Sequence, residues 1–228
     1  MRSTPRAGAA IRAAAAATAA MLAVGGCSAG DDGPSEEEAG AIAAARAYVD
    51  AIAALDFETA DAMTDPAALD YADNSDGDVD IRPALPDAVD PISDPWVSLV
   101  SPTYESQHSV PEYVLDVSYS IRELTGGDSI VVTLKEDADP DDVDSWTVTD
   151  ALIVWGETFS ELPRARIGSV ELTYGSTRHA GVWGYPGGYL LAPADATPGV
   201  EPLWVPVGAA DAPPWDDSLP MLERPGEE

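Results

Sequence analysis

The single cysteine of the chain, Cys27, follows a hydrophobic segment near the N-terminus, and this limits how the rest of the chain can be stabilised. The segment comes after three arginines and covers residues 13–24. It is too short to cross a bilayer as a helix but has the length of a signal-peptide core. With no second cysteine, the chain cannot form an intramolecular disulfide. The folded part must therefore be stabilised by packing alone.

The residues before Cys27 resemble the lipobox of bacterial lipoprotein signals, which reads aliphatic, small, small, cysteine. Val24, Gly25 and Gly26 occupy the three places before the cysteine. The resemblance implies that residues 1–26 are removed as a signal peptide and that the Cys27 thiol carries the lipid, with palmitate-type acyl chains that suffice as an anchor. We expect a lipoprotein on the outer face of the cytoplasmic membrane. An ordinary secretory signal with a stray thiol is the alternative.

Acidic residues dominate the composition, with 41 Asp and Glu against 11 Lys and Arg and a formal net charge of −30. Loss of the three signal-peptide arginines would make that charge −33. Such a surface repels nucleic acid and anionic lipid headgroups, so nucleic-acid binding is excluded. We interpret residues 27–38 as an acidic flexible tether. The use of arginine in place of lysine, with Lys135 as the single lysine, and the abundant alanine resemble the coding bias of a high-GC genome, and with the lipobox they suggest an actinobacterial source.

Two helices are predicted after the tether. Ser35-Glu36-Glu37-Glu38 has the form of a capping box, which predicts that a helix begins there. Apolar residues then recur at spacings of three and four as far as Leu55, the pattern of a helix that buries one face. Asp56 suits the N-cap of a second, shorter helix, which Pro66 would stop. A third short turn is expected over residues 66–71.

The chain after residue 95 is predicted to form antiparallel strands. Residues 72–95 contain many Asp and Pro and little periodicity, and we interpret them as an irregular loop. Alternation of apolar and polar residues predicts the clearest strand over Glu112–Arg122. The glycine pair within Leu124–Asp128 predicts a hairpin turn into a strand over Ser129–Lys135. The other strands are expected over residues 96–100, 104–110 and 146–155.

Helices followed by a curved antiparallel sheet give an α+β fold, and two segments add a family resemblance. Ala41–Ala60 resembles the opening of NTF2-like domains, and Ser145–Thr149 resembles the Trp-x-Val strand near their end. Exported members include the noncatalytic N-terminal module of some actinobacterial penicillin-binding proteins. The resemblance covers about residues 36–156 and implies a cone in which N-terminal helices pack on the sheet. We place this domain at residues 39–156; the proline-rich stretch 83–95 departs from the family pattern.

A small β-rich appendage is predicted at residues 165–207. It has strand-like alternation and a Tyr-Pro-Gly-Gly-Tyr turn at residues 185–189, and it resembles small β modules appended to such lipoproteins. Without a disulfide or metal, so short a module needs support from the first domain or from a partner. Residues 208–228 are rich in Pro and acids and are predicted to be a disordered tail.

The NTF2-like resemblance also implies where a pocket would lie. Members with enzymatic activity place an acidic base and tyrosine donors in the mouth of the cone. The corresponding candidates are Tyr48, Tyr113, Tyr119, Trp146 and Asp150. Strand alternation places Asp150 on the same face as Trp146, which would direct its carboxylate inward. The alternative for Asp150 is a strand-end acid that accepts backbone hydrogen bonds.

No motif of a hydrolase, a metalloprotease or a nucleotide-binding protein occurs in the sequence, and we expect no catalytic residue and no cofactor. His108 and His179 are interpreted as structural. The acidic run Asp73–Asp80 suggests calcium, but Ala72 and Pro83 stand where an EF-hand loop needs its first acid and its twelfth-place Glu. We therefore expect no specific metal site and interpret the run as a solvated acidic loop.

Three functions remain open at this point. The preferred one is a noncatalytic binding or scaffold protein of the cell envelope that contacts another envelope protein. The second is a carrier that holds a small apolar ligand in the cone. The third and least favoured is an isomerase-like or hydrolase-like enzyme that uses Asp150. A cone filled with side chains would argue against the second and third. Trp183, Trp204 and Trp215 serve either in packing or as interface anchors.

Overall fold

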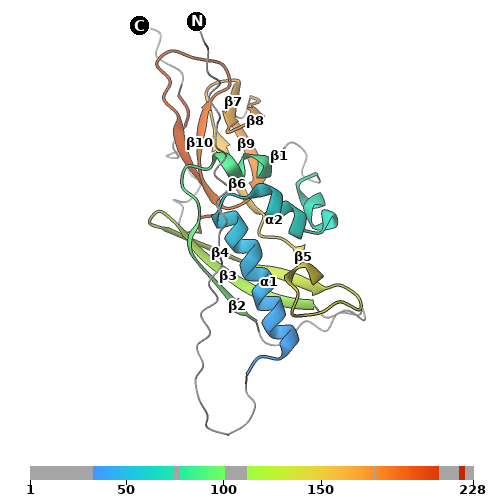
Figure 1. The fold of residues 1–228 in the computed structure, drawn as a ribbon. Helices are drawn as coiled ribbons and strands as arrows, with labels where there is room; N and C mark the ends of the chain where they lie inside the picture. Colours follow the sequence, from blue (N-terminus) through green and yellow to red (C-terminus); the bar gives the residue numbers. More distant parts are fainter. Residues whose placement is uncertain (1–32, 74–77, 101–111, 177, 211–220, 224–228) are drawn as a thin grey trace, which may run out of the picture. The chain divides into compact units, whose positions relative to one another are not determined.

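The protein folds as α+β, with few helices and mostly antiparallel sheets (Figure 1). The computed structural model describes residues 33–73, 78–100, 112–176, 178–210 and 221–223. The described residues from 34 onward belong to one compact unit. The lipobox with Cys27, the predicted strand at 104–110, and His108 and Trp215 lie outside the described residues. Within the described residues, no helix is both long and apolar enough to span a membrane.

The first helix, α1 (Glu36–Ala53), begins as the capping box predicts. The Ser35 hydroxyl accepts a hydrogen bond from the Glu38 amide at 3.2 Å, and Glu38 Oε2 accepts one from the Ser35 amide at 2.7 Å. The helix therefore starts inside the segment that we assigned to the tether. Its buried face carries small and medium apolar side chains around one large aromatic residue: Ala41, Ala44, Ala45, Tyr48, Val49 and Ile52.

The second helix, α2 (Phe57–Met63), is capped by Asp56, whose carboxylate accepts a hydrogen bond from the Thr59 amide at 3.1 Å. This confirms the predicted N-cap. A 3₁₀ helix, η1 (Pro66–Asp73), follows where the short turn was expected. Between them the chain is extended, and Asp65 donates its amide to the Val148 carbonyl at 2.8 Å. The helical segment is thus tied to the edge of the first sheet.

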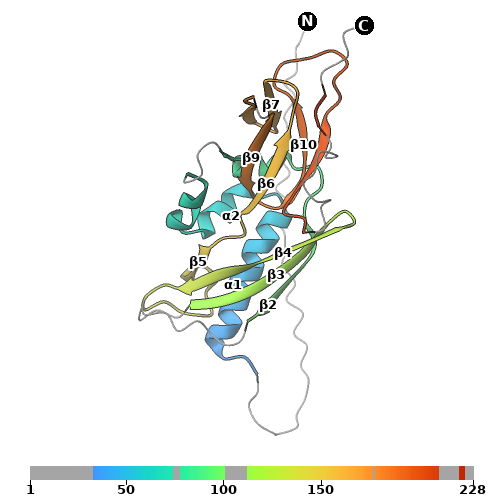
Figure 2. The same ribbon diagram turned by 180° about the vertical axis from the view of Figure 1, so that it is seen from behind.

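The first sheet is antiparallel and has the order β2 (Ser93–Leu99), β3 (Glu112–Ile121), β4 (Leu124–Leu134) and β5 (Trp146–Asp150). Helix α1 covers one face of it, as the two opposite views show (Figures 1 and 2). Inward-facing residues of β3 and β4 alternate with exposed ones and meet the apolar face of α1. These side chains fill the space between helix and sheet.

The predicted hairpin turn at the glycine pair is wrong. The chain turns at Arg122 and Glu123, with Arg122 in the left-handed region at φ 55°, and Gly126 and Gly127 lie within β4. A Cβ atom on Gly126 would collide with the Gly208 carbonyl and the Tyr119 ring. These glycines therefore permit close approach of neighbouring chain segments, which local turn statistics do not report.

The predicted long strand 146–155 is also wrong, because the chain changes sheet within it. β5 ends at Asp150, and β6 (Val154–Phe159) begins a different sheet. That second sheet has the order β1 (Val79–Asp80), β9 (His179–Gly184) and β6. A run of strand-forming residues cannot by itself reveal such a crossing, because both halves have strand character.

The third sheet has the order β11 (Leu203–Val207), β10 (Gly187–Pro193), β7 (Arg164–Ile167) and β8 (Val170–Thr173). It corresponds to the β-rich unit that we predicted at 165–207. Met221, Leu222 and Glu223, from the segment predicted as a disordered tail, lie at the end of β6, where Ser160 and Leu222 form an isolated bridge. Leu222 is buried, and its amide donates to the Phe159 carbonyl at 3.1 Å.

The described residues of the segment 72–95 do not form a wholly irregular loop, and those from 78 onward connect the sheets. β1 pairs in parallel with β9, η2 (Arg82–Asp87) is a 3₁₀ helix, and β2 begins at Ser93. Gly188 donates its amide to the Asp90 carbonyl at 2.7 Å. A further 3₁₀ turn, η3 (Val143–Ser145), leads into β5. Pairing partners far along the chain thus order a segment that shows no periodicity of its own.

Candidate functional site

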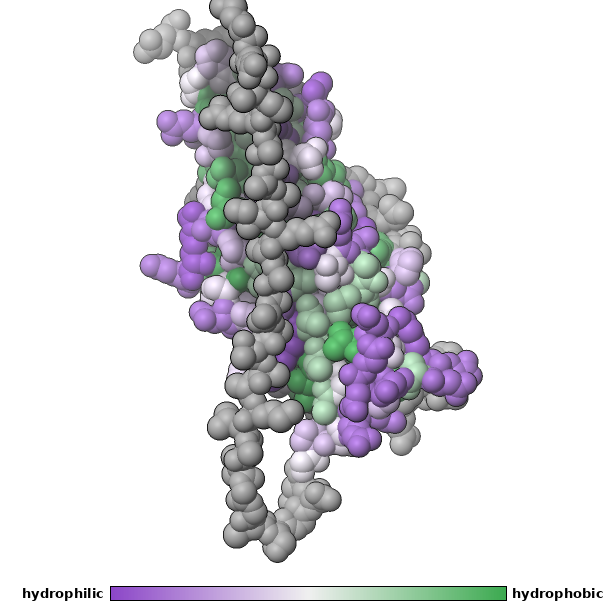
Figure 3. Space-filling view, viewed as in Figure 1, coloured by the Kyte–Doolittle hydropathy of each residue, from purple (hydrophilic) through white to green (hydrophobic). Residues whose placement is uncertain are grey.

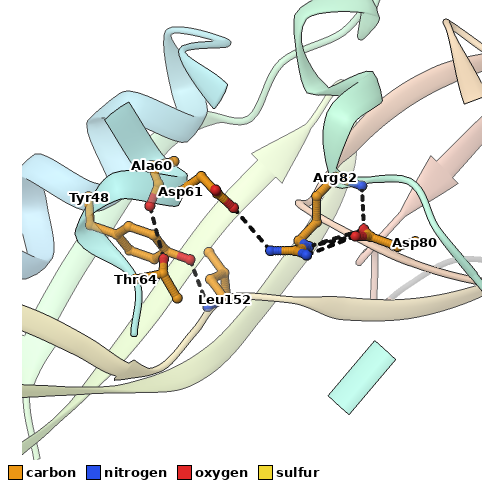
Figure 4. Close-up of polar contacts among 7 residues, drawn as sticks. All are labelled: Tyr48, Ala60, Asp61, Thr64, Asp80, Arg82 and Leu152. Carbon is orange, nitrogen blue, oxygen red and sulfur yellow. Dashed lines mark hydrogen bonds and ion pairs between the residues drawn. The ribbon is translucent and has the colours of Figure 1, made fainter. Parts of the chain in front are cut away.

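The interior between α1, α2 and the strand crossing holds a cluster of polar side chains (Figure 4). Tyr48 projects from α1 and is fully buried. Its hydroxyl accepts a hydrogen bond from the Leu152 amide at 3.1 Å. Leu152 lies between β5 and β6, so this bond satisfies a backbone group exposed where the chain leaves one sheet for the next.

Two further hydroxyl groups belong to this region. Thr64 is buried, and its hydroxyl donates to the Ala60 carbonyl at 2.9 Å. Tyr185 enters from the turn between β9 and β10 and packs edge-to-face on Tyr48, with ring centroids 6.4 Å apart. Among the described residues its own hydroxyl forms no hydrogen bond of standard geometry, although the nearby Thr64 and Tyr48 hydroxyls partly offset the effect of burial on its pKa. Burial raises the pKa of both Tyr48 and Tyr185, so both phenols stay neutral at physiological pH.

Arg82 closes the cluster on one side. Its guanidinium lies 3.1 Å from Asp61 Oδ1 and 2.8 Å from Asp80 Oδ2, and only 12% of its side chain is exposed. Figure 4 shows it between these two carboxylates, which come from α2 and β1. Burial by itself lowers the pKa of Arg82, but the hydrogen bonds and charge of Asp80, together with the electrostatic effects of Tyr185 and Asp61, raise it by more. The group is a permanently charged link between the helices and the second sheet.

The two ion pairs of Arg82 were not predicted from the sequence. In so acidic a chain, an arginine two residues after Asp80 is a signal for an ion pair. The second carboxylate, Asp61, could not be assigned from the sequence because it lies on a separate helix.

Tyr113 and Trp146, two predicted pocket residues, lie against each other in the core. Their rings meet edge-to-face with centroids 5.6 Å apart. The Tyr113 hydroxyl donates to Glu37 Oε2 at 2.8 Å, and the Trp146 indole donates to the Pro140 carbonyl at 3.0 Å. Burial, followed by the hydrogen bond and charge of Glu37, raises the pKa of Tyr113. Both polar groups are thus engaged by other parts of the same chain.

Tyr119, a third predicted pocket residue, connects the first sheet to the end of β11. It is buried, and its hydroxyl donates to the Gly208 carbonyl at 2.7 Å. Burial, and then the charge of Asp128, raises its pKa. Gly208 has φ 81°, and a Cβ there would lie 2.7 Å from this hydroxyl. The contact therefore depends on glycine at that position.

Asp150 does not point inward as predicted. Asp150 pairs with Val131 of β4, but a register shift separates this pair from Val132 and Val148, and the Asp150 side chain is exposed. The bulge breaks the alternation that would have placed it on the face of Trp146. Partial desolvation, and then the charge of Asp128, raises the pKa of Asp150. No hydrogen bond joins it to a tyrosine hydroxyl in the described part of the chain.

Open surface grooves lie among the described residues. One of about 610 Å³ runs beside α2 and includes Trp146 in its lining, while the other four predicted pocket residues do not line it. A second, of about 460 Å³, lies on the third sheet. Over residues 33–73, 78–100, 112–176, 178–210 and 221–223, no group of three or more His, Cys, Asp or Glu side chains could hold a metal ion. Part of the suggested calcium run, residues 74–77, lies outside these ranges.

Acidic side chains instead accept hydrogen bonds from indole groups. Asp90 Oδ2 accepts from Trp204 Nε1 at 2.7 Å, and the Arg122 guanidinium lies 2.6 Å from the same oxygen. Arg122 also lies over the Trp204 ring, 4.3 Å from its centroid. Asp78 Oδ2 accepts from both Trp155 Nε1 and Trp183 Nε1. The sequence analysis did not assign partners to these acids.

No family model, curated protein or solved structure matches this chain. Its function is therefore inferred from its own geometry. That geometry contains neutral, buried phenols, a paired buried arginine and exposed carboxylates. Acid–base catalysis near neutral pH needs a group with a pKa near neutrality that can reach substrate. The tyrosines described above have pKa values shifted away from that range.

Proposed function

We propose that the protein is a noncatalytic binding or scaffold protein of the cell envelope. In this proposal Cys27 carries a lipid that anchors it at the outer face of the cytoplasmic membrane, and the folded part contacts another envelope protein. The helices and first sheet form an NTF2-like module of the kind found, without catalysis, at the N-terminus of some penicillin-binding proteins. A helical pair that precedes an antiparallel sheet and covers one face of it supports that comparison.

One observation carries the proposal: the side chains expected to line an open cone are part of a packed interior. Tyr48, Tyr113, Tyr119 and Trp146 all belong to the same buried cluster. Each of their polar groups bonds to another part of this chain, as described above. A ligand site needs polar groups directed at open space. An interior arranged in this way favours a binding role for the outer surface over a carrier or an enzyme.

The surface also favours a protein partner of complementary charge. Figure 3 shows hydrophilic residues over much of the described face, with a paler hydrophobic strip in the region of α1. The net charge of −30 disfavours anionic partners. Partner recognition at such a surface depends on a few aromatic or basic anchors surrounded by polar residues.

Native mass spectrometry of the full-length protein, gently extracted from its host, tests the proposal. We expect an acylated chain without a stoichiometric small-molecule adduct, alone or with a second protein. A stoichiometric apolar ligand released on denaturation would contradict it and support the carrier function.

The anchor is tested separately by replacing Cys27 with Ala and following the protein through membrane fractionation. We expect the variant to leave the membrane fraction, because the acyl chains supply the membrane affinity. Ser28→Ala is the matched control and should remain bound. A Cys27→Ala variant that still sediments with membranes would contradict the lipid anchor.

A further inference from the structure

Trp155 and Trp183 form a rigid aromatic pair on one face of the second sheet. They are directly paired across β6 and β9, and their ring centroids lie 6.5 Å apart at an interplanar angle of 59°. Asp78 Oδ2 accepts from Trp155 Nε1 at 3.2 Å and from Trp183 Nε1 at 3.1 Å. One carboxylate thus fixes the orientation of both rings, while Trp155 stays 41% exposed.

Neighbouring residues on β6 and β9 accommodate the two tryptophans and Asp78. Gly181 faces Asp78 from β9, and a Cβ atom there would collide with the carboxylate. Glu157 follows Trp155 by two residues on β6, so it lies on the same face of the sheet. Three carboxylates therefore accompany the aromatic pair: Asp78, Glu157 and Asp80, the last of which is paired with Trp183 across β1 and β9. Asp80 is bound by Arg82 and Glu157 lies 4.0 Å from His179 Nδ1, which leaves Asp78 as the carboxylate considered below.

Another part of the chain shows what a carboxylate that is hydrogen-bonded to an indole can bind. At Trp204, an aspartate accepts from the indole, and an arginine pairs with that aspartate while lying over the ring. The Asp78 unit repeats the indole and carboxylate, but Asp78 forms no ion pair with a basic side chain of the described residues. A cation over the face of an indole is attracted by the ring quadrupole, and a neighbouring carboxylate strengthens the attraction.

We propose that Asp78, Trp155 and Trp183 form a binding site for an arginine or lysine side chain of a partner protein. The carboxylate pairs with the cation and the indole rings receive its flat or apolar part, as Asp90 and Trp204 do for Arg122. Charge complementarity selects this occupant, because a chain with net charge −30 attracts a cationic surface over distance. The site deepens the proposed binding function and rests on it.

The test uses N-acetyl-arginine methylamide as the probe and its neutral citrulline analogue as the control ligand. The indole N–H signals of the full-length protein are followed by NMR during titration. We expect the signals of Trp155 and Trp183 to shift saturably with the arginine probe, and that of Trp96, which is 64% exposed, to stay in place. Equal shifts with the citrulline probe, or no shift, would overturn the proposal.

Two charge-matched variants separate the site from the general acidity of the surface. Asp78→Asn keeps an oxygen acceptor for the indoles and removes one charge, and Glu201→Gln removes one charge from an exposed residue elsewhere. We expect Asp78→Asn to weaken probe binding about two- to fivefold and Glu201→Gln to leave it unchanged. Equal affinities of the two variants would overturn the proposal.

An aromatic variant completes the test. Trp155→Leu should weaken binding of the probe about two- to fivefold, whereas Trp96→Leu should not change it. An unchanged Trp204 indole signal verifies that each variant is folded. These outcomes are independent of the native mass spectrum: a small apolar ligand there contradicts the scaffold function, whereas loss of discrimination between the variants contradicts only this site.

Discussion

The helix–sheet region, α1 to β5, and the β-rich region, β6 to β11, are stabilised by different kinds of contact. In the first, a periodic stripe of alanines and aliphatic residues on α1 meets alternating residues of β3 and β4. In the second, tryptophans donate hydrogen bonds to aspartates of the segment between η1 and β2, far away in the sequence, as Trp183 does to Asp78 and Trp204 to Asp90. Periodic contacts can be predicted from local sequence, whereas these long-range polar contacts cannot.

Each region also contributes side chains to the hydrophobic cluster of the other. Tyr185, from the β9–β10 turn, lies in the hydrophobic cluster of the first region, while Ile81 and Ala84, from the segment before β2, lie in that of the second. We expect the β-rich region to depend on the first for its stability and the two to unfold together. The four predictions below test this dependence.

Alkaline pH should have the largest effect, because buried tyrosines occur in both regions. Burial raises the pKa of Tyr48 and Tyr119 in the first, of Tyr189 in the second, and of Tyr174 to about 12. In the unfolded chain tyrosine ionises near pH 10. The contribution of these tyrosines to the free energy of unfolding is therefore fully present below about pH 10. It falls as the pH rises further, because the unfolded chain then loses its phenol protons more easily than the folded chain.

Thermal unfolding followed by circular dichroism at increasing pH measures this loss, with tyrosinate absorbance as a second probe. Coincident transitions of the two probes are expected if the regions unfold together. Two well-separated transitions would show that the β-rich region is independent.

Tyr185→Ala should be the most destabilising single substitution proposed here. It removes a fully buried aromatic ring that contacts Tyr48 and Phe57, and such truncations cost about 3–5 kcal/mol. Denaturant unfolding monitored by tryptophan fluorescence gives the free energy of unfolding. A loss under about 1 kcal/mol would contradict the role of Tyr185 in joining the regions.

Gly188→Ala should disrupt the junction between β10 and the segment before β2. A Cβ atom there would lie 2.6 Å from Trp204 Nε1 and 2.9 Å from Asp90 Cβ, so we expect a loss of about 1–3 kcal/mol. Gly187→Ala is the control, because its nearest contact is an ordinary 3.4 Å to the Tyr189 ring. Equal unfolding free energies for the two variants would argue against a close approach at this junction.

The pair Tyr48→Phe and Tyr185→Phe should give the smallest and most specific difference. Tyr48→Phe leaves the buried Leu152 amide without its acceptor, which costs about 1–3 kcal/mol. Tyr185→Phe removes a buried hydroxyl that forms no hydrogen bond of standard geometry with the described residues and has only the Thr64 and Tyr48 hydroxyls close by, so we expect a loss below about 1 kcal/mol. Urea unfolding of the two variants side by side provides the comparison, and a greater loss in Tyr185→Phe would contradict the assigned hydrogen bonding.

Much of the first region could be predicted because its signals are local. The capping box at Ser35, the N-cap at Asp56 and the alternation from Glu112 all concern residues a few positions apart, and the structure confirms each. The turn predicted at Gly126 and Gly127 was wrong because Gly126 permits close approach of the Gly208 carbonyl and does not form a turn. The inward direction predicted for Asp150 was wrong because a bulge interrupts the alternation of the strand, and a single sequence does not reveal a bulge.

The candidate site was predicted only as a set of residues. Tyr48, Tyr113, Tyr119 and Trp146 do share one buried cluster, yet the sequence could not say whether their polar groups face an open cavity or the chain itself. The partners that decide this, Leu152, Glu37, Gly208 and Pro140, lie up to 104 residues away from the groups they bind.

The sequence by itself determined the α+β class, the helix starts, the main antiparallel strands and the strongly acidic character, because capping, periodicity and net charge are local or additive properties. Only the tertiary structure decided that the run after Trp146 divides between two sheets, that residues 79–92 pair with the β-rich region, and that Asp78 holds two tryptophans. Those features depend on which distant segments meet, and that is set by how all the apolar surfaces can be buried at once.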